Sequence, residues 1–101
     1  MSISPADTHN REARAVHVRV DADRLTVDLD DGRIVSAPVT WFPLLYRGSI
    51  EQRNRWQLMA DGYGIHWPEL DEDISVEGLL KGQRAPDHWW EMFGIPRPAA
   101  A

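Results

Sequence analysis

Cysteine is absent from the chain. This absence excludes disulfide bridges, thiolate metal ligands and a cysteine nucleophile. Long apolar stretches are missing too, since no segment approaches the ~20 apolar residues that a membrane-spanning helix needs. Residues 1–14 contain no apolar run of the kind found in secretory signal peptides. We therefore expect a cytoplasmic protein with no membrane partner.

Positive charge is scarce. Lys and Arg total 11 against 16 Asp and Glu, which gives a net charge of −5. Nucleic-acid binding relies on clustered basic residues, and those of this chain are scattered, except for Arg53 and Arg55 near Arg47. We interpret these three as solvated charges rather than a phosphate site. Direct binding to nucleic acid is therefore not expected.

Motifs for catalysis or metal binding are also missing. The four histidines are far apart, and no serine occurs in a Gly-x-Ser-x-Gly turn. The acidic run 69–73 has the carboxylate spacing of a calcium loop, but such a loop needs glycine at its sixth position. Ile74 or Val76 stands there instead. We predict no catalytic residue, no metal site and no cofactor.

The length of 101 residues suits one domain. Residues 1–14 are polar and have no apolar period, and residues 94–101 contain two prolines that interrupt regular structure. We therefore predict a flexible leader over 1–14, a single α+β domain over 15–93 and a flexible tail over 94–101.

Three strands are indicated before residue 40. Apolar and polar residues alternate over 15–21 and 24–30, which is typical of strands with one buried face. Asp31-Gly32 is a strong hairpin signal, because glycine supplies the positive φ of the turn, and residues 33–39 form the third strand. The residues predicted to face the core are Val16, Val18, Val20, Leu25, Val27 and Leu29.

The register of the second hairpin has two solutions. A two-residue loop places Leu29 opposite Ile34, and both then face the core, because opposed residues share a face. A longer loop with a bulge places Val35 and Ala37 inside instead. We favour the first solution.

The remainder of the chain is predicted to form short elements. The spacing of Ser49 and Gln52 is that of a capping box, and Ser75 precedes an apolar helical stripe. Helices are predicted over 40–46, 49–55, 76–81 and 86–93, and strands over 56–60 and 65–67. The predicted fold class is α+β, an antiparallel three-stranded β-meander followed by short helices and two further short strands.

Five tryptophans are many for a chain of this size. Exposed tryptophans indicate a binding interface. Adjacent residues of a helix point about 100° apart, so Trp89 and Trp90 cannot face one core equally. We predict that one covers the core and the other reaches a groove or a partner, with partial packing of both as the alternative. His66 alternates away from Trp67 and is predicted to face solvent or the edge of a groove.

Two motifs carry a resemblance to a known family. One is the strand pair Leu-x-Val-x-Leu-x-Asp-Gly over 25–32, and the other is Trp-Pro-x-Leu-Asp-x-Asp over 67–73, within the segment 64–80. Through them, residues from about 15 to 82 resemble the bacterial family known as domain of unknown function 2442 (DUF2442). The resemblance implies a small α+β fold and no established catalytic residue. It also implies a two-gene module in which this family is the antitoxin-like half.

We predict a non-enzymatic protein-interaction module, because the chain is acidic, rich in tryptophan and without a catalytic constellation. Its partner is expected to be a protein, such as a small toxin-like protein encoded nearby, and a homodimer is also plausible. One alternative is a regulatory or DNA-associated domain, because some longer relatives carry a helix-turn-helix domain. Another is a small-molecule-binding protein or enzyme that uses His66 with Asp71 or Asp73. The predicted interaction surface comprises His66, Trp67, Pro68, Asp71, Asp73, Trp89 and Trp90.

Overall fold

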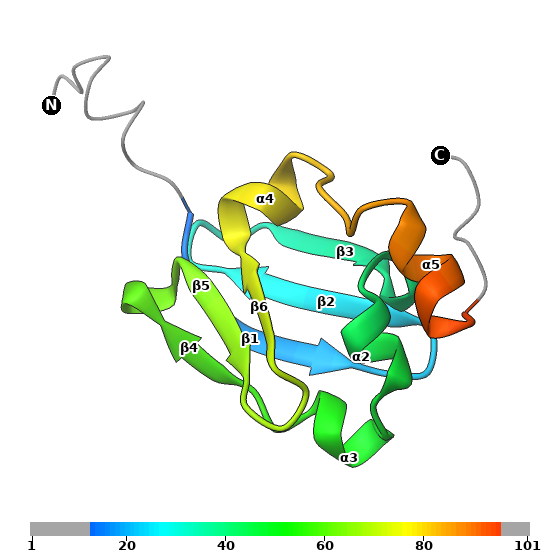
Figure 1. Cartoon of the computed structure of the whole chain (residues 1–101). Helices are drawn as coiled ribbons and strands as arrows, with labels where there is room; N and C mark the ends of the chain where they lie inside the picture. Colours follow the sequence, from blue (N-terminus) through cyan, green and yellow to red (C-terminus); the bar gives the residue numbers. More distant parts are fainter. Residues whose placement is uncertain (1–12, 96–101) are drawn as a thin grey trace, which may run out of the picture.

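A computed structural model describes residues 13–95 (Figure 1). The predicted flexible leader and tail lie mostly outside this range. Two residues assigned to the leader belong to the fold. Ala13 is buried in the core. The backbone of Arg14 makes two hydrogen bonds with Asp30: the Asp30 N–H donates to the Arg14 carbonyl at 2.8 Å, and the Arg14 N–H donates to the Asp30 side-chain carboxylate at 3.0 Å.

The first half of the chain forms the predicted antiparallel meander. Strands β1 (Ala15–Val20), β2 (Arg24–Leu29) and β3 (Ile34–Pro38) pair in the order β1-β2-β3 (Figure 1). Alternation buries one face of β2 and of the second half of β1, as the pattern predicted. The predicted α+β class with a three-stranded meander is confirmed.

The favoured register of the second hairpin is wrong. Ile34 pairs with the residue before Leu29 and is 63% exposed, whereas Ala37 is buried. The Leu29 N–H donates to the Arg33 carbonyl at 2.9 Å, which makes the loop three residues long. Gly32 completes this loop with a φ of +92°. The alternative with a longer, bulged loop is therefore correct.

A second irregularity occurs at the start of β1. The pairing of β1 with β2 shifts between Ala15 and His17. Ala15 consequently takes the buried position, and Val16 is 54% exposed rather than facing the core. A bulge adds one residue to a strand and breaks its alternation, so the valine pattern alone could not locate this shift.

Three short helical turns connect the two halves. A 3-10 turn, η1 (Val39–Trp41), and helix α2 (Pro43–Arg47) replace the single predicted helix over 40–46. Phe42 interrupts them with an extended φ of −125°; the residue before a proline is disfavoured in helical conformation. Helix α3 (Ile50–Arg53) begins at the predicted capping box of Ser49 and Gln52.

A second antiparallel sheet follows, in the order β4-β5-β6. Its strands are β4 (Gln57–Met59), β5 (Gly64–Trp67) and β6 (Glu72–Ser75), and a 3-10 turn, η2 (Ala60–Gly62), joins the first two. Two of these strands were predicted. The third, β6, was not predicted and begins inside the segment interpreted as an acidic loop. Only Ile74 of its four residues is buried, so the sequence of this strand shows no alternating apolar pattern.

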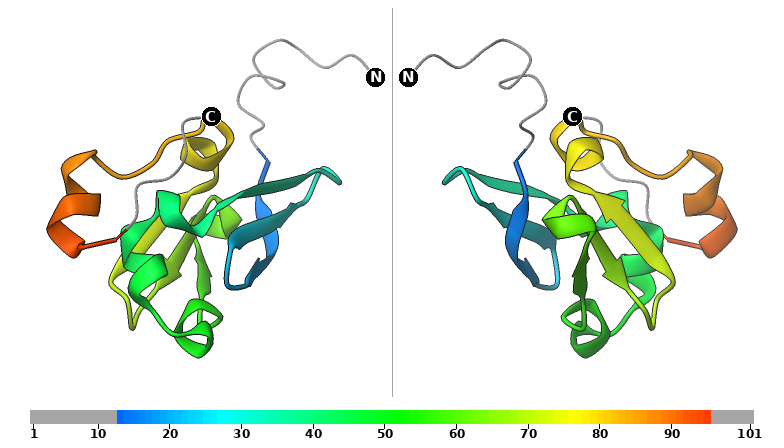
Figure 2. Two further views of the ribbon diagram at one scale, coloured as in Figure 1. Left: turned by 90° about the vertical axis from the view of Figure 1, so that its right-hand side faces the viewer. Right: turned by 90° about the vertical axis from the view of Figure 1, so that its left-hand side faces the viewer.

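The chain ends in two short helices. Helix α4 (Val76–Leu80) is N-capped by Ser75, as predicted, since the Ser75 hydroxyl accepts from the Gly78 N–H at 2.9 Å. Helix α5 (His88–Phe93) ends at Gly94 in the left-handed conformation. It lies on the side of the second sheet that faces away from β1–β3 (Figure 2).

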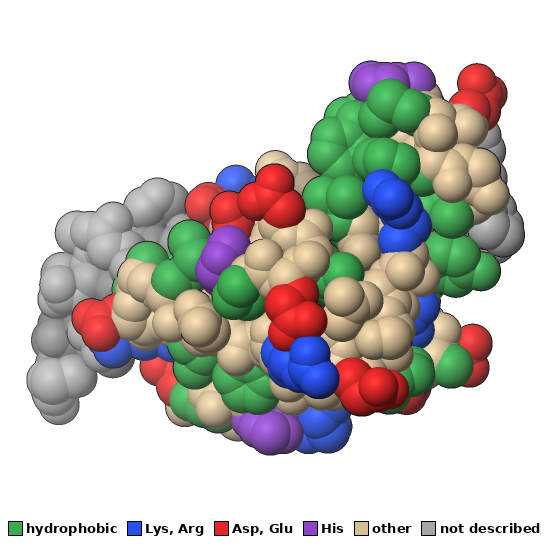
Figure 3. Space-filling view, turned by 60° about the horizontal axis from the view of Figure 1, so that its bottom comes forward, with side chains coloured by type: hydrophobic (Ala, Val, Ile, Leu, Met, Phe, Trp, Pro, Cys, Tyr) green, Lys and Arg blue, Asp and Glu red, His purple; other side chains and the backbone are tan. Residues whose placement is uncertain are grey.

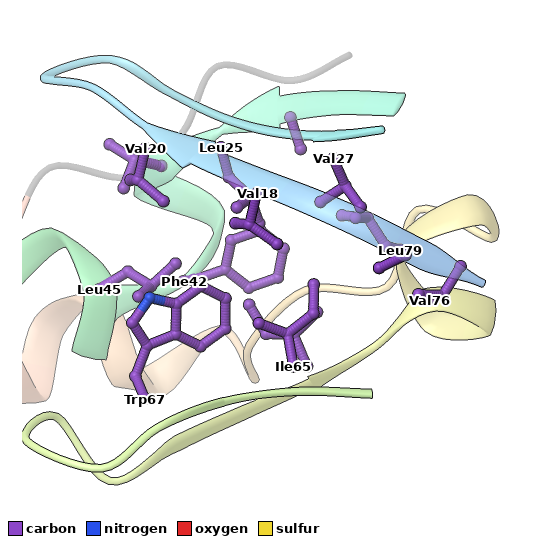
Figure 4. Packing of buried hydrophobic residues seen from close by; sticks show 14 of the residues in the cluster. Val18, Val20, Leu25, Val27, Phe42, Leu45, Ile65, Trp67, Val76 and Leu79 are labelled. Atoms are coloured by element: carbon purple, nitrogen blue, oxygen red, sulfur yellow. The ribbon is translucent and has the colours of Figure 1, made fainter. Parts of the chain in front are cut away.

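The core lies between the two sheets, which form separate layers in Figure 2. Ile65 and Trp67 of β5 point toward Val18 and Leu25 of the first sheet (Figure 4), and all four are buried. Leu45 of α2 closes one end of this cluster. The alternating residues of the meander therefore hold the second sheet in place through apolar contact.

Arg53 is the one charged residue buried among residues 13–95. Its guanidinium donates to the backbone carbonyls of Leu45, Tyr46 and Asp21 at 2.8–2.9 Å. These bonds tie α3 to α2 and to the β1–β2 turn. Its own carbonyl accepts the indole N–H of Trp67 at 2.8 Å, so this residue links the two sheets.

Candidate functional site

A groove runs along the free edge of β6. It has a volume of about 240 Å³, and all four consecutive residues of β6 line it. Successive side chains of a strand point to opposite faces, so a hollow that reaches every residue must follow the edge of the strand rather than one face. We call this hollow the β6 groove. Its other lining residues are Phe42, Gly78, Leu79, Gln83, Arg84, Ala85, Pro86 and Trp89.

The wall opposite β6 is aromatic. Trp89 of α5 is half-buried and packs edge-on against Phe93, with ring centres 5.7 Å apart. Phe42, between η1 and α2, is also part of the lining. The guanidinium of Arg84 lies 5.4 Å from the centre of the Trp41 ring. Side chains from three separate segments therefore converge on this wall.

Glu72 is the most perturbed titratable group of the groove. Burial raises its pKa to about 7, and the nearby charges of Asp73 and Asp71 act in the same direction. The Asp73 N–H, which donates to Glu72 Oε1 at 2.8 Å, opposes this shift. Glu72 pairs with Trp67 across the hairpin and therefore lies on the inward face of the sheet, at its margin.

His66 and Asp73 face outward from the same hairpin. They are paired across β5 and β6, and His66 Nδ1 contacts the Asp73 carboxylate. The His66 side chain is 33% exposed and that of Asp73 is 63% exposed. The prediction that His66 alternates away from Trp67 is confirmed.

The acidic residues of this region do not converge on one point. Glu72 lies on the inward face, whereas Asp73 lies on the outward face with His66. Asp71 is exposed in the β5–β6 turn with a φ of +54°. Within residues 13–95, no three His, Asp or Glu side chains lie close enough together to share a metal ion.

The Trp-Pro-x-Leu-Asp-x-Asp motif is explained largely by the β5–β6 hairpin. Trp67 is 0% exposed, so its predicted place on the interaction surface is wrong. Pro68 follows it in a turn closed by the bond from the Leu70 N–H to the Trp67 carbonyl at 3.2 Å. The Leu70 side chain packs back toward Gly48, where an added Cβ would lie 2.7 Å from Leu70 Cδ1.

The two adjacent tryptophans divide as predicted, with one in the core and one at the groove. Trp90 is 2% exposed, and its indole N–H donates to the Thr40 carbonyl. Trp89 lines the β6 groove. The prediction that Trp90 belongs to the interaction surface is therefore wrong, because its ring is buried.

Figure 3 shows one face of the molecule on which these features meet. A histidine lies beside acidic side chains, hydrophobic side chains gather over α5 next to a basic one, and the surface is hollowed between the two groups.

The arginines near residue 50 have separate surroundings. Arg55 pairs with Glu69 at 2.8 Å, and Arg47 lies 4.6 Å from the Phe93 ring centre. The interpretation of these three arginines as solvated charges is wrong for Arg53, which is buried and bonded to backbone carbonyls.

Sequence reasoning did not identify Glu72, Phe42 or Arg84 as site residues. Glu72 was visible only as one acid of the run 69–73, and its burial depends on the pairing of β6 with β5. Phe42 and Arg84 are about 40 residues apart and meet only in the folded chain. No local pattern signals such a convergence.

No helix within residues 13–95 combines the length and apolar character that crossing a membrane requires. Among curated proteins, none matches the chain. The model of a family described as "Protein of unknown function (DUF2442)" matches residues 15–85. This match spans the region in which the two sequence motifs occur.

Two solved structures are similar to the chain. A crystal structure of a protein of unknown function from Rhodospirillum rubrum ATCC 11170 has 33% sequence identity and a TM-score of 0.69, covering 78% of this chain and 98% of that chain. A solution structure of an uncharacterised protein from Chromobacterium violaceum has 21% identity and a TM-score of 0.64, covering 81% and 77%. The second likeness concerns the fold alone.

Proposed function

The chain belongs to the DUF2442 family, as its motifs predicted, and we propose that it is a non-enzymatic protein-interaction module that binds a partner protein at the β6 groove. The observation that carries this proposal is the combination of an edge strand with an aromatic wall along one hollow. Edge strands and exposed aromatic rings are recurring features of peptide-recognition sites.

The charges of the groove favour a basic partner. Glu72 and Asp73 line it against one basic residue, Arg84, and Asp71 lies in the adjoining turn. The chain as a whole carries a net charge of −5. Complementary charge speeds association and selects among partners. We therefore infer that the bound segment carries Lys or Arg.

The family resemblance suggests a specific partner class. In a two-gene module, this chain would be the antitoxin-like half and would neutralise a small basic protein encoded nearby. Masking of the basic surface by the acidic groove would be the physical basis of neutralisation. Co-expression of both proteins followed by size-exclusion chromatography tests this finer proposal. Co-elution supports it, and separate elution at micromolar concentration contradicts it.

A random peptide library displayed on phage tests the module itself. We expect the intact chain to select peptides rich in Lys or Arg, which are then synthesised and measured by isothermal titration calorimetry. Trp89→Ala should weaken their binding by about tenfold or more, because aromatic residues dominate binding energies. Met92→Ala is the matched control, since Met92 is exposed on the same helix outside the groove. Equal affinity in both variants would exclude the groove.

One observation favours a second function. His66 Nδ1 contacts the Asp73 carboxylate, and a carboxylate that orients an imidazole is a common arrangement in sites for small molecules and acid–base chemistry. The outward position of this pair supports only a shallow site. If His66→Ala removes binding of a metabolite in a thermal-shift screen while Trp89→Ala does not, this second function replaces the first.

A further inference from the structure

The free side of β6 presents backbone groups to the β6 groove. Within residues 13–95, β6 pairs only with β5. Backbone groups of successive strand residues point alternately to the two sides of the strand. The Val76 N–H donates to the Tyr63 carbonyl, at the β5 side, whereas the Asp73 N–H donates to the Glu72 side chain. The Asp73 N–H and carbonyl therefore point away from β5.

Glu72 occupies the position of a strand partner. Its Oε1 accepts from the Asp73 N–H at 2.8 Å, as the carbonyl of an added strand would. A carboxylate has no donor to offer the Asp73 carbonyl in return. Burial also raises the pKa of Glu72 to about 7, so its charged form is held at the edge against a desolvation cost. The edge is covered by a group that an incoming strand could replace favourably.

We propose that an extended basic segment of the partner adds to β6 as a further strand and replaces the Glu72 carboxylate at the Asp73 N–H. This proposal rests on the proposed function, because it specifies how the β6 groove holds its partner. Successive side chains of the added strand point to opposite faces. One set meets the aromatic wall at Trp89, and the other carries the Lys or Arg that pairs with the released Glu72.

The pairing of the released Glu72 carboxylate with a cation favours the strand-bound state over the free edge. Glu72 exchanges one charge-assisted bond from a backbone N–H for an ion pair with Lys or Arg, in which a full positive charge compensates its carboxylate. The Asp73 N–H keeps an acceptor throughout, since the incoming carbonyl replaces the carboxylate. The Asp73 carbonyl gains a donor. Strand addition therefore pairs both backbone groups of Asp73 with another backbone, whereas Glu72 pairs only the N–H.

Backbone methylation of a selected peptide tests strand addition directly. Each amide nitrogen of the peptide is methylated in turn, and affinity for the intact chain is measured by calorimetry. We expect losses of about tenfold at every second residue and small changes between them, because only alternate N–H groups face the edge. Losses without this alternation overturn the proposal.

A pair of variants at one position tests the same bond from the protein side. Asp73→Pro removes the N–H that the added strand would use, and proline is tolerated on edge strands where the N–H faces outward. Asp73→Ala removes the same carboxylate and keeps the N–H. We expect Asp73→Pro to bind the peptide about tenfold more weakly than Asp73→Ala. Equal affinities contradict strand addition. If Asp73→Pro does not fold, the methylation series decides alone.

The outcomes separate this inference from the proposed function. If no peptide binds, or if binding ignores Trp89→Ala, the groove is not a partner site and both proposals fail. If a peptide binds through Trp89 without alternating sensitivity to methylation, the module stands and strand addition fails. Binding with that alternation supports both.

Discussion

The two sheets differ in how their outer strands are covered. At the end of β1, the Asn54 carboxamide accepts from the Val20 N–H at 3.2 Å and donates to the Val20 carbonyl at 2.8 Å. At β6, the Glu72 carboxylate accepts from the Asp73 N–H and offers nothing to the carbonyl. Both side chains replace a neighbouring strand, but only the amide does so completely.

This difference separates a structural edge from an accessible one. Asn54 is neutral and satisfies both backbone groups of Val20, so this end of β1 gains little from any other partner. Glu72 has a raised pKa and satisfies one group. Unsatisfied edges tend to pair with another chain. The comparison therefore predicts that changes near β1 reduce stability, whereas changes near β6 alter binding.

The largest expected effect is at Arg53, next to Asn54. Arg53→Met removes the guanidinium donors from the carbonyls of Leu45, Tyr46 and Asp21. The Leu45 carbonyl alone keeps a further donor, the Gly48 N–H at 3.0 Å. We expect the free energy of unfolding to fall by about 3–5 kcal/mol, which is typical when a buried polar network is broken. Urea denaturation followed by tryptophan fluorescence measures this. The exposed Arg55→Met is the control and should unfold near the wild type.

At Asn54, the comparison can be tested by replacing the amide, which both donates and accepts, with a carboxylate, which only accepts as Glu72 does. Asn54→Ala removes three hydrogen bonds, including one to the Ile50 carbonyl at 2.9 Å. We expect a loss of about 1–3 kcal/mol and faster hydrogen exchange at the Val20 amide. Asn54→Asp keeps only the acceptor, as at β6, and should expose the Val20 carbonyl. Unchanged stability in Asn54→Asp would show that the two covers are equivalent.

Glu72 should make stability depend on pH. Its pKa is raised in the folded protein from 4.5 to about 7, so the folded state binds more protons between these values, and stability falls as pH rises through this window. Glu72→Gln should remove this decline. We expect the variant to be more stable than the wild type by about 1–2 kcal/mol at pH 8, after allowance for partial exposure. At pH 4 the two should agree.

Urea denaturation across this pH range measures the difference. Glu51→Gln, on the exposed surface of α3, is a matched control and should keep the decline. A wild-type stability that rises from pH 5 to pH 8 in parallel with Glu72→Gln would show that Glu72 titrates normally. In that case the contact of Glu72 with the edge of β6 would be as stable as that of Asn54 with β1.

The sequence predicted the parts of the fold that rest on local patterns. The meander, the capping box at Ser49 and the cap at Ser75 follow from alternation and side-chain hydrogen bonds within a few residues. The prediction of the hairpin register was wrong because the register depends on whether the loop contains two or three residues. The prediction that Val16 faces the core was wrong because the bulge in β1 cannot be recognised in an alternating sequence.

The candidate site was harder to predict because tertiary pairing creates it. His66 and Asp73 were both named, and the β5–β6 pairing brings them into contact. Trp67 was assigned to the surface as one of the tryptophans expected at an interface, although its indole is buried in the core. Glu72 gained importance only through β6, a strand with a single buried residue. A specific motif can thus mark a fold rather than a site.

The smallest expected effect on stability is at Trp89, across the groove from the open edge. Its ring is half-buried in the first turn of a six-residue helix, so Trp89→Ala should lower the free energy of unfolding by about 1 kcal/mol or less. Trp90→Ala should cost about 3 kcal/mol, because that ring is covered and bonded to Thr40. Urea denaturation of both variants measures the difference. If Trp89→Ala is as destabilising as Trp90→Ala, the aromatic wall is part of the core, and the contrast between a structural edge and an accessible one disappears.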